Sequence, residues 1–294
     1  MIPMGAVFLA ANGVFVAVVL LVLGVLARRN QVSHSARRRW TPDTAIRAVG
    51  RRGALRRADA AEYLGRNQHR EAVPALCALL TDRDRTVRMV AARSLGRIGS
   101  PDAVSALLGS VTNARMPQQV VAEAMIRLGR PARTRLVAAL GAEQPRARAV
   151  AVEVLGLVGA IDAIPRLVVV LRHDPVLEVK IRAARALGRI GTLSAFGALL
   201  DAARPDQPQP LRAVAAQALG NLGDPAATLR LTLLLSDDDY WVAHNAAGAL
   251  VRLGEAGMRT LQTTAQRGTG QAAVHALEAL TVHALHAQTA STAV

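Results

Sequence analysis

The sequence predicts an all-α protein, an α-solenoid of about eight two-helix repeats preceded by one transmembrane helix. Residues 89–99 read MVAARSLGRIG and residues 184–191 read ARALGRIG, so the same phrase occurs twice in the chain. Its Leu has counterparts at steps of 30–32 residues, and such a fixed period is typical of repeat architectures. Apolar residues make up 51% of the chain but aromatic residues only 2%. This composition, rich in Ala and Leu, favours closely packed helices.

The first segment of the chain has the length and composition of a membrane-spanning helix. Residues 4–27 are 24 residues without a charge, and Asn12 is their only strongly polar member. As a helix they would span ~36 Å at ~1.5 Å per residue, against a hydrocarbon core of roughly 30 Å. A signal peptide would begin with positive residues, whereas the start MIPMGA has none. We therefore expect a transmembrane helix over residues 1–27.

One side of this predicted span is lined by small residues. They recur at spacings of three and four, so they lie on one helical stripe, and a second helix can approach such a stripe closely. Asn12 beside the stripe can donate a hydrogen bond to that second helix. Chance placement of common residues is the alternative. The residues expected to pack against another helix are Ala6, Ala10, Asn12, Gly13 and Ala17.

A basic linker follows the span at residues 28–41. The excess of Arg predicts a single-pass protein of the inner (cell) membrane, with its N-terminus outside and the repeats in the cytoplasm. Residues 28–57 hold ten Arg and one acid, Asp43, for a net charge of +9 within the chain's +15. Arg side chains at this place can contact anionic lipid head groups, or they can serve only as a topology signal. The residues in question are Arg28, Arg29, Arg37, Arg38 and Arg39.

The repeats are predicted to occupy residues 42–286, and a short disordered tail is predicted at residues 287–294. In each repeat one helix ends at the Leu-Gly phrase, where a terminal Gly suits the left-handed residue that closes a helix. The next helix opens with a capping residue or with Pro in its first turn, as in SPDAVSALL. We call the recurring Leu the repeat leucine position. Its members are Leu64, Leu95, Met125, Leu155, Leu187, Leu219, Leu250 and, more loosely, Leu280.

This pattern of Asp-Pro, Val-Arg and Ala-Ala-x-Ala-Leu-Gly-x-Ile-Gly resembles the short HEAT repeats of the phycobilin-lyase type, over about residues 42–286. The resemblance implies a ladder of polar contacts between neighbouring repeats, formed by the Arg of Val-Arg and a turn Asp. Gln118, Ala243 and Ala273 stand at ladder positions without a cation, so the third repeat and the last two repeats should be less regular. The implied cations are Arg57, Arg88, Arg148, Lys180 and Arg212, and the implied acids are Asp82, Asp84, Asp174, Asp206 and Asp239.

The position two residues before the repeat leucine is predicted to face the concave side of the solenoid. Its residues are mixed in charge, which suits a protein partner better than a phosphate backbone. We expect the partner to be membrane-embedded, an enzyme or a transporter for which this chain is an accessory subunit. The residues expected to contact it are Arg93, Glu123, Glu153, Arg185 and Gln217.

Neither a catalytic constellation nor a cofactor or metal site is expected from the sequence. The chain contains no phosphate loop and no nucleophile elbow, and Cys77 is its single cysteine. His275, His283 and His286 would share one helical face with Glu278, but residues eight positions apart lie about 12 Å apart along a helix, at ~1.5 Å per residue. We therefore interpret them as a polar face of a terminal helix.

Two other functions stay open. A membrane-tethered protein that binds nucleic acid is one alternative, since a basic solenoid can follow phosphates; however, few aromatic residues are available to stack on bases. An enzyme similar to the phycobilin lyases is the second alternative. A membrane-anchored adaptor that binds a protein and does not catalyse a reaction is the prediction, and no small-molecule substrate is expected.

Overall fold

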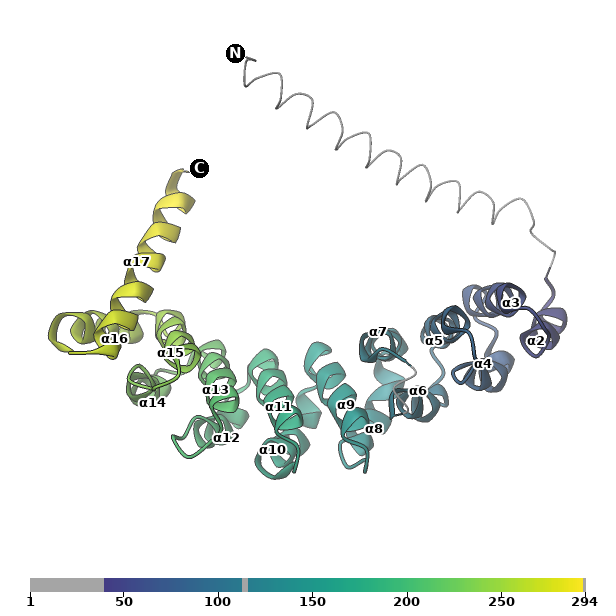
Figure 1. Ribbon diagram of the computed structural model, residues 1–294, viewed down its shortest axis with the longest axis horizontal. Coiled ribbons are helices and arrows are strands. Elements are labelled where there is room, and N and C mark those ends of the chain that lie inside the picture. Colours follow the sequence, from purple (N-terminus) through teal and green to yellow (C-terminus); the bar gives the residue numbers. More distant parts are fainter. Residues whose placement is uncertain (1–39, 113–115, 293–294) are drawn as a thin grey trace, which may run out of the picture.

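The computed structural model describes residues 40–112 and 116–292, and every regular element in these ranges is helical. Eight helix pairs stack side by side into a curved array (Figure 1). The first helices of the pairs form the outer layer: α2 Pro42–Val49, α4 Val73–Leu79, α6 Ala103–Thr112, α8 Arg130–Ala139, α10 Ile164–His173, α12 Phe196–Ala202, α14 Thr228–Leu234 and α16 Glu255–Arg267. The second helices form the inner layer: α3 Ala54–Arg66, α5 Arg85–Ile98, α7 Gln118–Leu128, α9 Pro145–Leu157, α11 Leu177–Ile190, α13 Gln209–Leu222, α15 Tyr240–Arg252 and α17 Gln271–Thr292.

Short 3-10 turns lead into four of the outer helices. They are η1 Arg70–Ala72, η2 Ile161–Ala163, η3 Leu193–Ala195 and η4 Pro225–Ala227, before α4, α10, α12 and α14. The all-helical class is therefore confirmed for the described residues, and the arrangement is that of an α-solenoid. The inner helices line the concave side of the array, and α17 rises from its C-terminal end (Figure 1).

The helix ends follow from local chemistry. Gly99 and Gly191 close α5 and α11 with φ of 74° and 73°, a left-handed conformation that costs Gly little. Asp84 caps α5 by accepting hydrogen bonds from the backbone N–H groups of Thr86 and Val87. Pro131 stands in the first turn of α8, where its missing N–H has no helical partner to lose.

The repeat leucine position forms the centre of a continuous core. Leu64, Leu95, Leu155, Leu187 and Leu219 are all fully buried, in one cluster that runs through the stack from Ala45 to Ala276. Because a single helix pair cannot bury its apolar face alone, each repeat depends on its neighbours.

The Gly of the Leu-Gly phrase allows the inner helices to approach closely. A Cβ at Gly188 would lie 2.5 Å from the Cβ of Ala218 on the next inner helix, and one at Gly156 would lie 2.6 Å from that of Ala186. Real Cβ atoms do not come so close. The phrase therefore has two functions: its Leu fills the core, and its Gly leaves room for the next repeat.

Two regions are less regular than the rest. The inner helix of the third repeat, α7, has 11 residues, whereas α5, α11 and α13 each have 14. At the C-terminal end, α17 continues to Thr292. Residues 287–292 of the expected disordered tail are thus helical, since the stretch AQTAST contains neither Gly nor Pro to stop the helix.

The predicted membrane segment lies outside the described residues, as do its packing stripe (Ala6, Ala10, Asn12, Gly13 and Ala17) and the Arg residues of the linker (Arg28, Arg29, Arg37, Arg38 and Arg39). Among the residues that are described, none of the helices is long and apolar enough to span a bilayer. Trp40 is half-buried and packs on the core of the first repeat.

Candidate functional site

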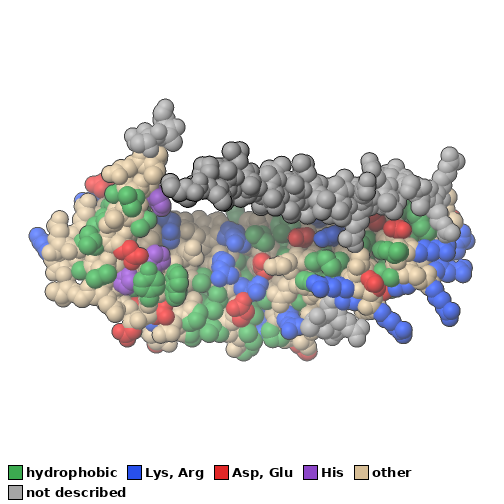
Figure 2. All heavy atoms as spheres, turned by 45° about the horizontal axis from the view of Figure 1, so that its top comes forward, with side chains coloured by type: hydrophobic (Ala, Val, Ile, Leu, Met, Phe, Trp, Pro, Cys, Tyr) green, Lys and Arg blue, Asp and Glu red, His purple; other side chains and the backbone are tan. Residues whose placement is uncertain are grey.

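The candidate site is the concave surface, which we define as the side chains two residues before and two residues after the repeat leucine position. Residues four positions apart share one face of a helix, so both sets project from the inner helices to the same side. Figure 2 brings this side forward and shows basic, acidic and apolar side chains interspersed along the array. The surface extends over all the inner helices.

The structure places the five predicted contact residues on five consecutive inner helices. Four of them are exposed, and Glu153 is half-buried. They therefore form one row across the concave surface, although their role in binding stays a prediction. From α5 to α13 the row consists of Arg93, Glu123, Glu153, Arg185 and Gln217.

Several charges of this surface are neutralised within it. Glu62 accepts hydrogen bonds from Arg66 Nε at 3.0 Å and from Arg97 Nη1 at 2.8 Å. Glu153 accepts from Arg182 Nη1 at 2.6 Å, so this predicted contact residue already has a partner on the next helix. Such pairs link neighbouring repeats and leave less charge for a ligand.

A second row on the same surface was not predicted from the sequence, because only the position two residues before the repeat leucine was considered there. Two residues after it stand Arg97, Arg127, Leu157 and Arg189, one on each helix from α5 to α11. Arg127 and Arg189 are exposed, and no ion pair or hydrogen bond of their side chains occurs among the described residues. The fixed offset of two residues after the repeat leucine is the sequence signal that could have identified this row.

The two rows meet at a small hollow on α9 and α11. It has a volume of about 120 Å³ and is lined by Glu153, Arg182, Arg185, Ala186 and Arg189. Three guanidinium groups against one carboxylate give this hollow a positive balance. Guanidinium groups bind carboxylates and phosphates through paired hydrogen bonds.

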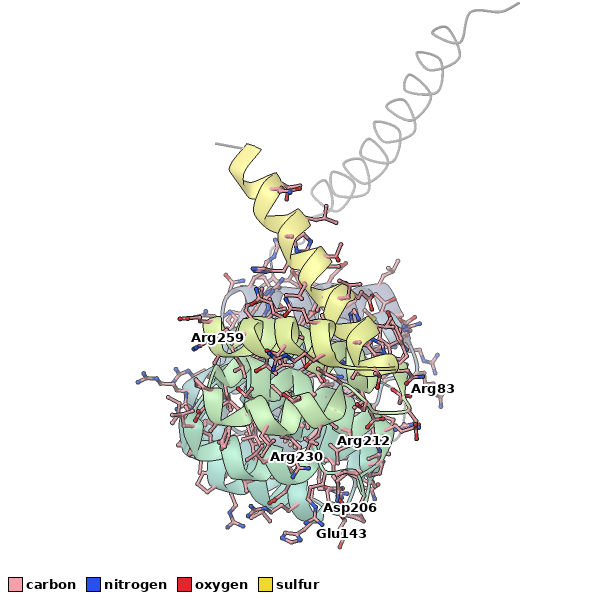
Figure 3. All side chains as sticks on the ribbon, turned by 90° about the vertical axis from the view of Figure 1, so that its left-hand side faces the viewer. Arg83, Glu143, Asp206, Arg212, Arg230 and Arg259 are labelled. Carbon is pink, nitrogen blue, oxygen red and sulfur yellow. The ribbon has the colours of Figure 1, made fainter. Side chains whose placement is uncertain are left out.

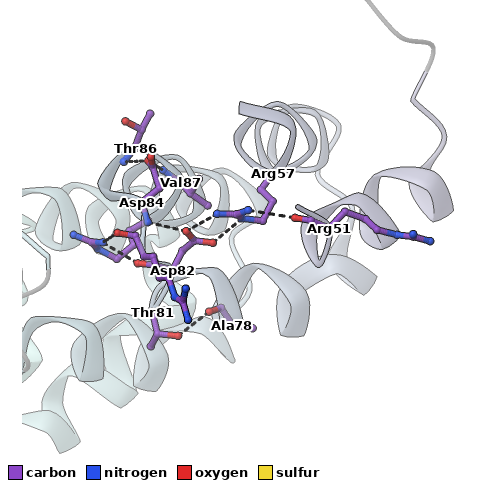
Figure 4. A network of polar contacts seen from close by, with 10 residues as sticks. Arg51, Arg57, Ala78, Thr81, Asp82, Asp84, Thr86 and Val87 are labelled. Atoms are coloured by element: carbon purple, nitrogen blue, oxygen red, sulfur yellow. Dashed lines mark hydrogen bonds and ion pairs between the residues drawn. The ribbon is translucent and has the colours of Figure 1, made fainter. Parts of the chain in front are cut away.

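The expected polar ladder is present at three repeats, along the turns that join outer to inner helices. Arg148 donates from Nε and Nη2 to the carboxylate of Asp174 at 2.6 and 2.9 Å, and from Nη1 to the Ala142 and Glu143 carbonyls. Arg57 binds Asp82 in the same bidentate way, with both distances 2.8 Å (Figure 4). Figure 3 shows the turns of Arg83, Glu143 and Asp206 along one edge of the stack.

The third pair has a partner that the sequence reasoning did not select. Arg212 binds Asp237 at 2.8 and 2.6 Å, 25 residues further along the chain. Asp237 and Asp239 are two residues apart, as are Asp82 and Asp84. The first acid receives the Arg of the previous repeat, and the second caps its own helix: Asp84 caps α5 and Asp239 caps α15. The expectation that Asp84 and Asp239 pair with ladder cations is thus wrong.

Lys180 and Asp206 differ from the expectation. Lys180 Nζ donates to the Arg172 carbonyl at 3.0 Å, and Asp206 pairs with the exposed Arg204 instead. Lys180 is the ladder cation of the repeat before Asp206, and its ammonium lacks the planar fork that holds a carboxylate at two points. Asp206 is therefore not a ladder acid. Arg88 donates to the backbone carbonyls of Asp82 and Arg83.

The ladder shifts the pKa values of its members. Burial by itself raises the pKa of the Asp82 carboxyl, but hydrogen bonds from Arg57 and from the Asp84 N–H, with the charges of Arg57 and Arg88, outweigh it. The pKa of Asp82 therefore lies below its ordinary value. The hydrogen bond to Asp174 likewise raises the pKa of Arg148. In both groups the shift favours the charged form.

At the C-terminal end of the concave surface, a groove of about 260 Å³ lies between α15 and α17. Its polar residues are His244, Arg252, His275, Glu278, His283 and His286, and Ala and Val side chains line the rest. His275 is buried, and Tyr240 donates a hydrogen bond to Glu278 at 3.2 Å. No group of His, Cys, Asp or Glu in the described part of the chain has the arrangement of a metal site.

Comparison with known proteins identifies the repeats. A family model of HEAT repeats matches residues 50–128, 132–219 and 196–280, which together are most of the chain. The chain belongs to the HEAT-repeat family. No curated protein gives a significant match to the sequence.

Several solved structures share the architecture. Kap121p is 12% identical and superposes with a TM-score of 0.58, over 76% of this chain and 30% of Kap121p. The complex of CpcE and CpcF of phycocyanin lyase from Nostoc sp. PCC7120 is 26% identical, with a TM-score of 0.35 over 77% of this chain and 94% of that one. Human deoxyhypusine hydroxylase is 21% identical, with a TM-score of 0.38 over 72% and 84%. The likeness to Kap121p supports the fold alone, and the HEAT-repeat solenoid fits a protein-binding scaffold.

Proposed function

We propose that this chain is a membrane-anchored adaptor whose concave surface binds a protein partner. The observation that supports this function is a row of side chains of mixed charge, one on each inner helix from α5 to α13 and all exposed except the half-buried Glu153. A surface that repeats along a solenoid can contact an extended stretch of another protein. Fold alone does not define a function, so the proposal depends on this surface.

The partner that we propose is membrane-embedded, an enzyme or a transporter with this chain as its accessory subunit. Two features of the sequence support this choice: the uncharged residues 4–27 and the Arg-rich linker at residues 28–41. The positive charge next to the span favours a cytoplasmic solenoid at the inner membrane. The chain itself binds and does not catalyse in this proposal.

The test is co-purification from native membranes in mild detergent, with the full-length chain as bait. The R93E/R185E variant reverses two charges of the concave surface, and R166E is its matched control on the outer helix α10, where Arg166 is exposed. We expect a stoichiometric membrane protein with the wild type and with R166E, and its loss with R93E/R185E. A fourth chain lacks residues 1–30. If it also loses the membrane protein, part of the recognition belongs to the span.

Equal capture of the partner by the wild type, R93E/R185E and R166E would contradict binding by the concave surface. Capture of nucleic acid alone would contradict the adaptor function as a whole.

A further inference from the structure

The charges of the concave surface divide into paired and unpaired groups. Glu62 and Glu153 are bound by Arg residues of the next helix. Within the described residues, four cations and one acid of this surface on α5, α7 and α11 have no ion-pair partner: Arg93, Arg127, Arg185, Arg189 and Glu123. The part of the surface that is free to bind a ligand is therefore basic.

The spacing of these cations matches an extended polypeptide. Packed helices lie ~8–10 Å apart, and an extended chain advances ~3.3 Å per residue, so each repeat corresponds to about three residues of a bound peptide. The row after the repeat leucine reads Arg97, Arg127, Leu157 and Arg189 along the array. Leu157, 44% exposed, stands where its neighbours have Arg.

We propose that this row binds an extended acidic segment of the protein partner. Arg127 and Arg189 hold carboxylates, since a guanidinium binds a carboxylate at two points, and an apolar side chain of the segment contacts Leu157. Arg93 and Arg185, one turn earlier on the same face, add positive charge. This inference rests on the proposed adaptor function and names the chemistry of its partner.

A protein segment fits this surface better than a nucleic acid. The helices α5, α7, α9 and α11 contain no aromatic residue, so bases have no platform to stack on. Glu123 is exposed on α7, one helical turn before Arg127, where it would repel a continuous phosphate backbone. A peptide can place a neutral residue opposite this carboxylate.

The test is fluorescence anisotropy with the full-length chain in detergent and labelled peptides of defined sequence. The peptide ESSESSLSSE and its reverse place carboxylates opposite the Arg positions and Leu opposite Leu157. The same peptides with Ser in place of Glu, and an oligothymidylate of equal charge, are the comparison ligands. We expect one of the two acidic peptides to bind tightest.

The variants sharpen the result. R127A/R189A should weaken binding of the acidic peptide ~10-fold, since each exposed ion pair contributes roughly threefold. R166A on the outer helix α10 should leave it unchanged. Equal binding of acidic and neutral peptides, tighter binding of the oligothymidylate, or equal loss with R166A would overturn the inference.

Co-purification of the membrane partner separates this inference from the proposed function. If R127A/R189A retains the partner while R93E/R185E loses it, the adaptor function stands and the acidic-segment inference fails. If every variant retains the partner, the concave adaptor function fails as well.

Discussion

At the scale of single residues, the bidentate pairs of Arg57, Arg148 and Arg212 link three inner helices to the turn of the following repeat. The most enclosed pair joins Arg148 and Asp174, whose side chains are 9% and 3% exposed. Removal of one member of a buried pair is costly because the other charge stays without compensation. These pairs therefore stabilise the stack and are not available to a ligand.

Arg148→Met should destabilise the protein by about 3 kcal/mol, since it leaves the Asp174 carboxylate buried and unpaired. The matched control is Arg172→Met, because Arg172 and Asp201 form an exposed pair with 45% and 55% exposed side chains. Exposed pairs of this kind contribute at most about 1 kcal/mol. Urea unfolding followed by circular dichroism measures both. Equal losses in the two variants would contradict a special role for the buried pair.

The acid stability of the protein should depend on Asp82. Its pKa is lowered in the folded state from 3.8, so the carboxylate stabilises the fold above the unfolded value and this contribution is lost as the pH falls through the folded value. Asp82→Asn should therefore be less stable than the wild type at neutral pH. Its disadvantage should shrink as the pH is lowered below about 4. A disadvantage that is constant between neutral and acid pH would exclude this linkage.

The ladder also shows what the sequence can and cannot predict for single residues. The resemblance to HEAT repeats located the cations Arg57, Arg148 and Arg212, because they recur at a fixed offset from the repeat leucine. It did not distinguish Asp237 from Asp239, since both acids lie in the same turn. Only the backbone geometry determines which acid faces the previous repeat and which caps the helix.

At the scale of helices, the close approach of neighbouring inner helices depends on glycine. Gly188→Ala would place a Cβ 2.5 Å from the Cβ of Ala218, and such overpacking costs roughly 1–3 kcal/mol. Gly197→Ala on α12 is the matched control, because nothing lies within 4 Å of its added Cβ. The control should stabilise the protein by ~0.5 kcal/mol through helix propensity. Thermal unfolding compares the two, and a stabilising Gly188→Ala would contradict the packing.

The helices themselves were predictable because their signals are local and periodic. Terminal glycines such as Gly99 and Gly191 stand where the sequence pattern places helix ends, whereas Asp84, expected in the ladder, caps α5. The C-terminal boundary was not predictable in the same way, since a polar stretch without Gly or Pro can either continue a helix or form an irregular tail. The structure extends α17 to Thr292.

At the scale of the whole molecule, the repeats turn one sequence position into a continuous surface. The row before the repeat leucine was identified from the sequence, but the ion pairs of its members were not. Glu153 of α9, for example, is bound by Arg182 of α11. The row with Arg127 and Arg189 lies on the same side. Which charges are free thus depends on contacts between repeats, and these appear only when the stack is assembled.

The central claim is that the concave surface binds the protein partner, and site-specific photo-crosslinking in native membranes tests it most directly. A photo-reactive phenylalanine derivative replaces Gln217 on the inner helix α13 in one chain, and Arg166 on the outer helix α10 in the other. Both positions are exposed. The account predicts a crosslinked membrane protein of defined mass from position 217 and none from position 166. A crosslink from position 166 alone, or none from position 217, would contradict it.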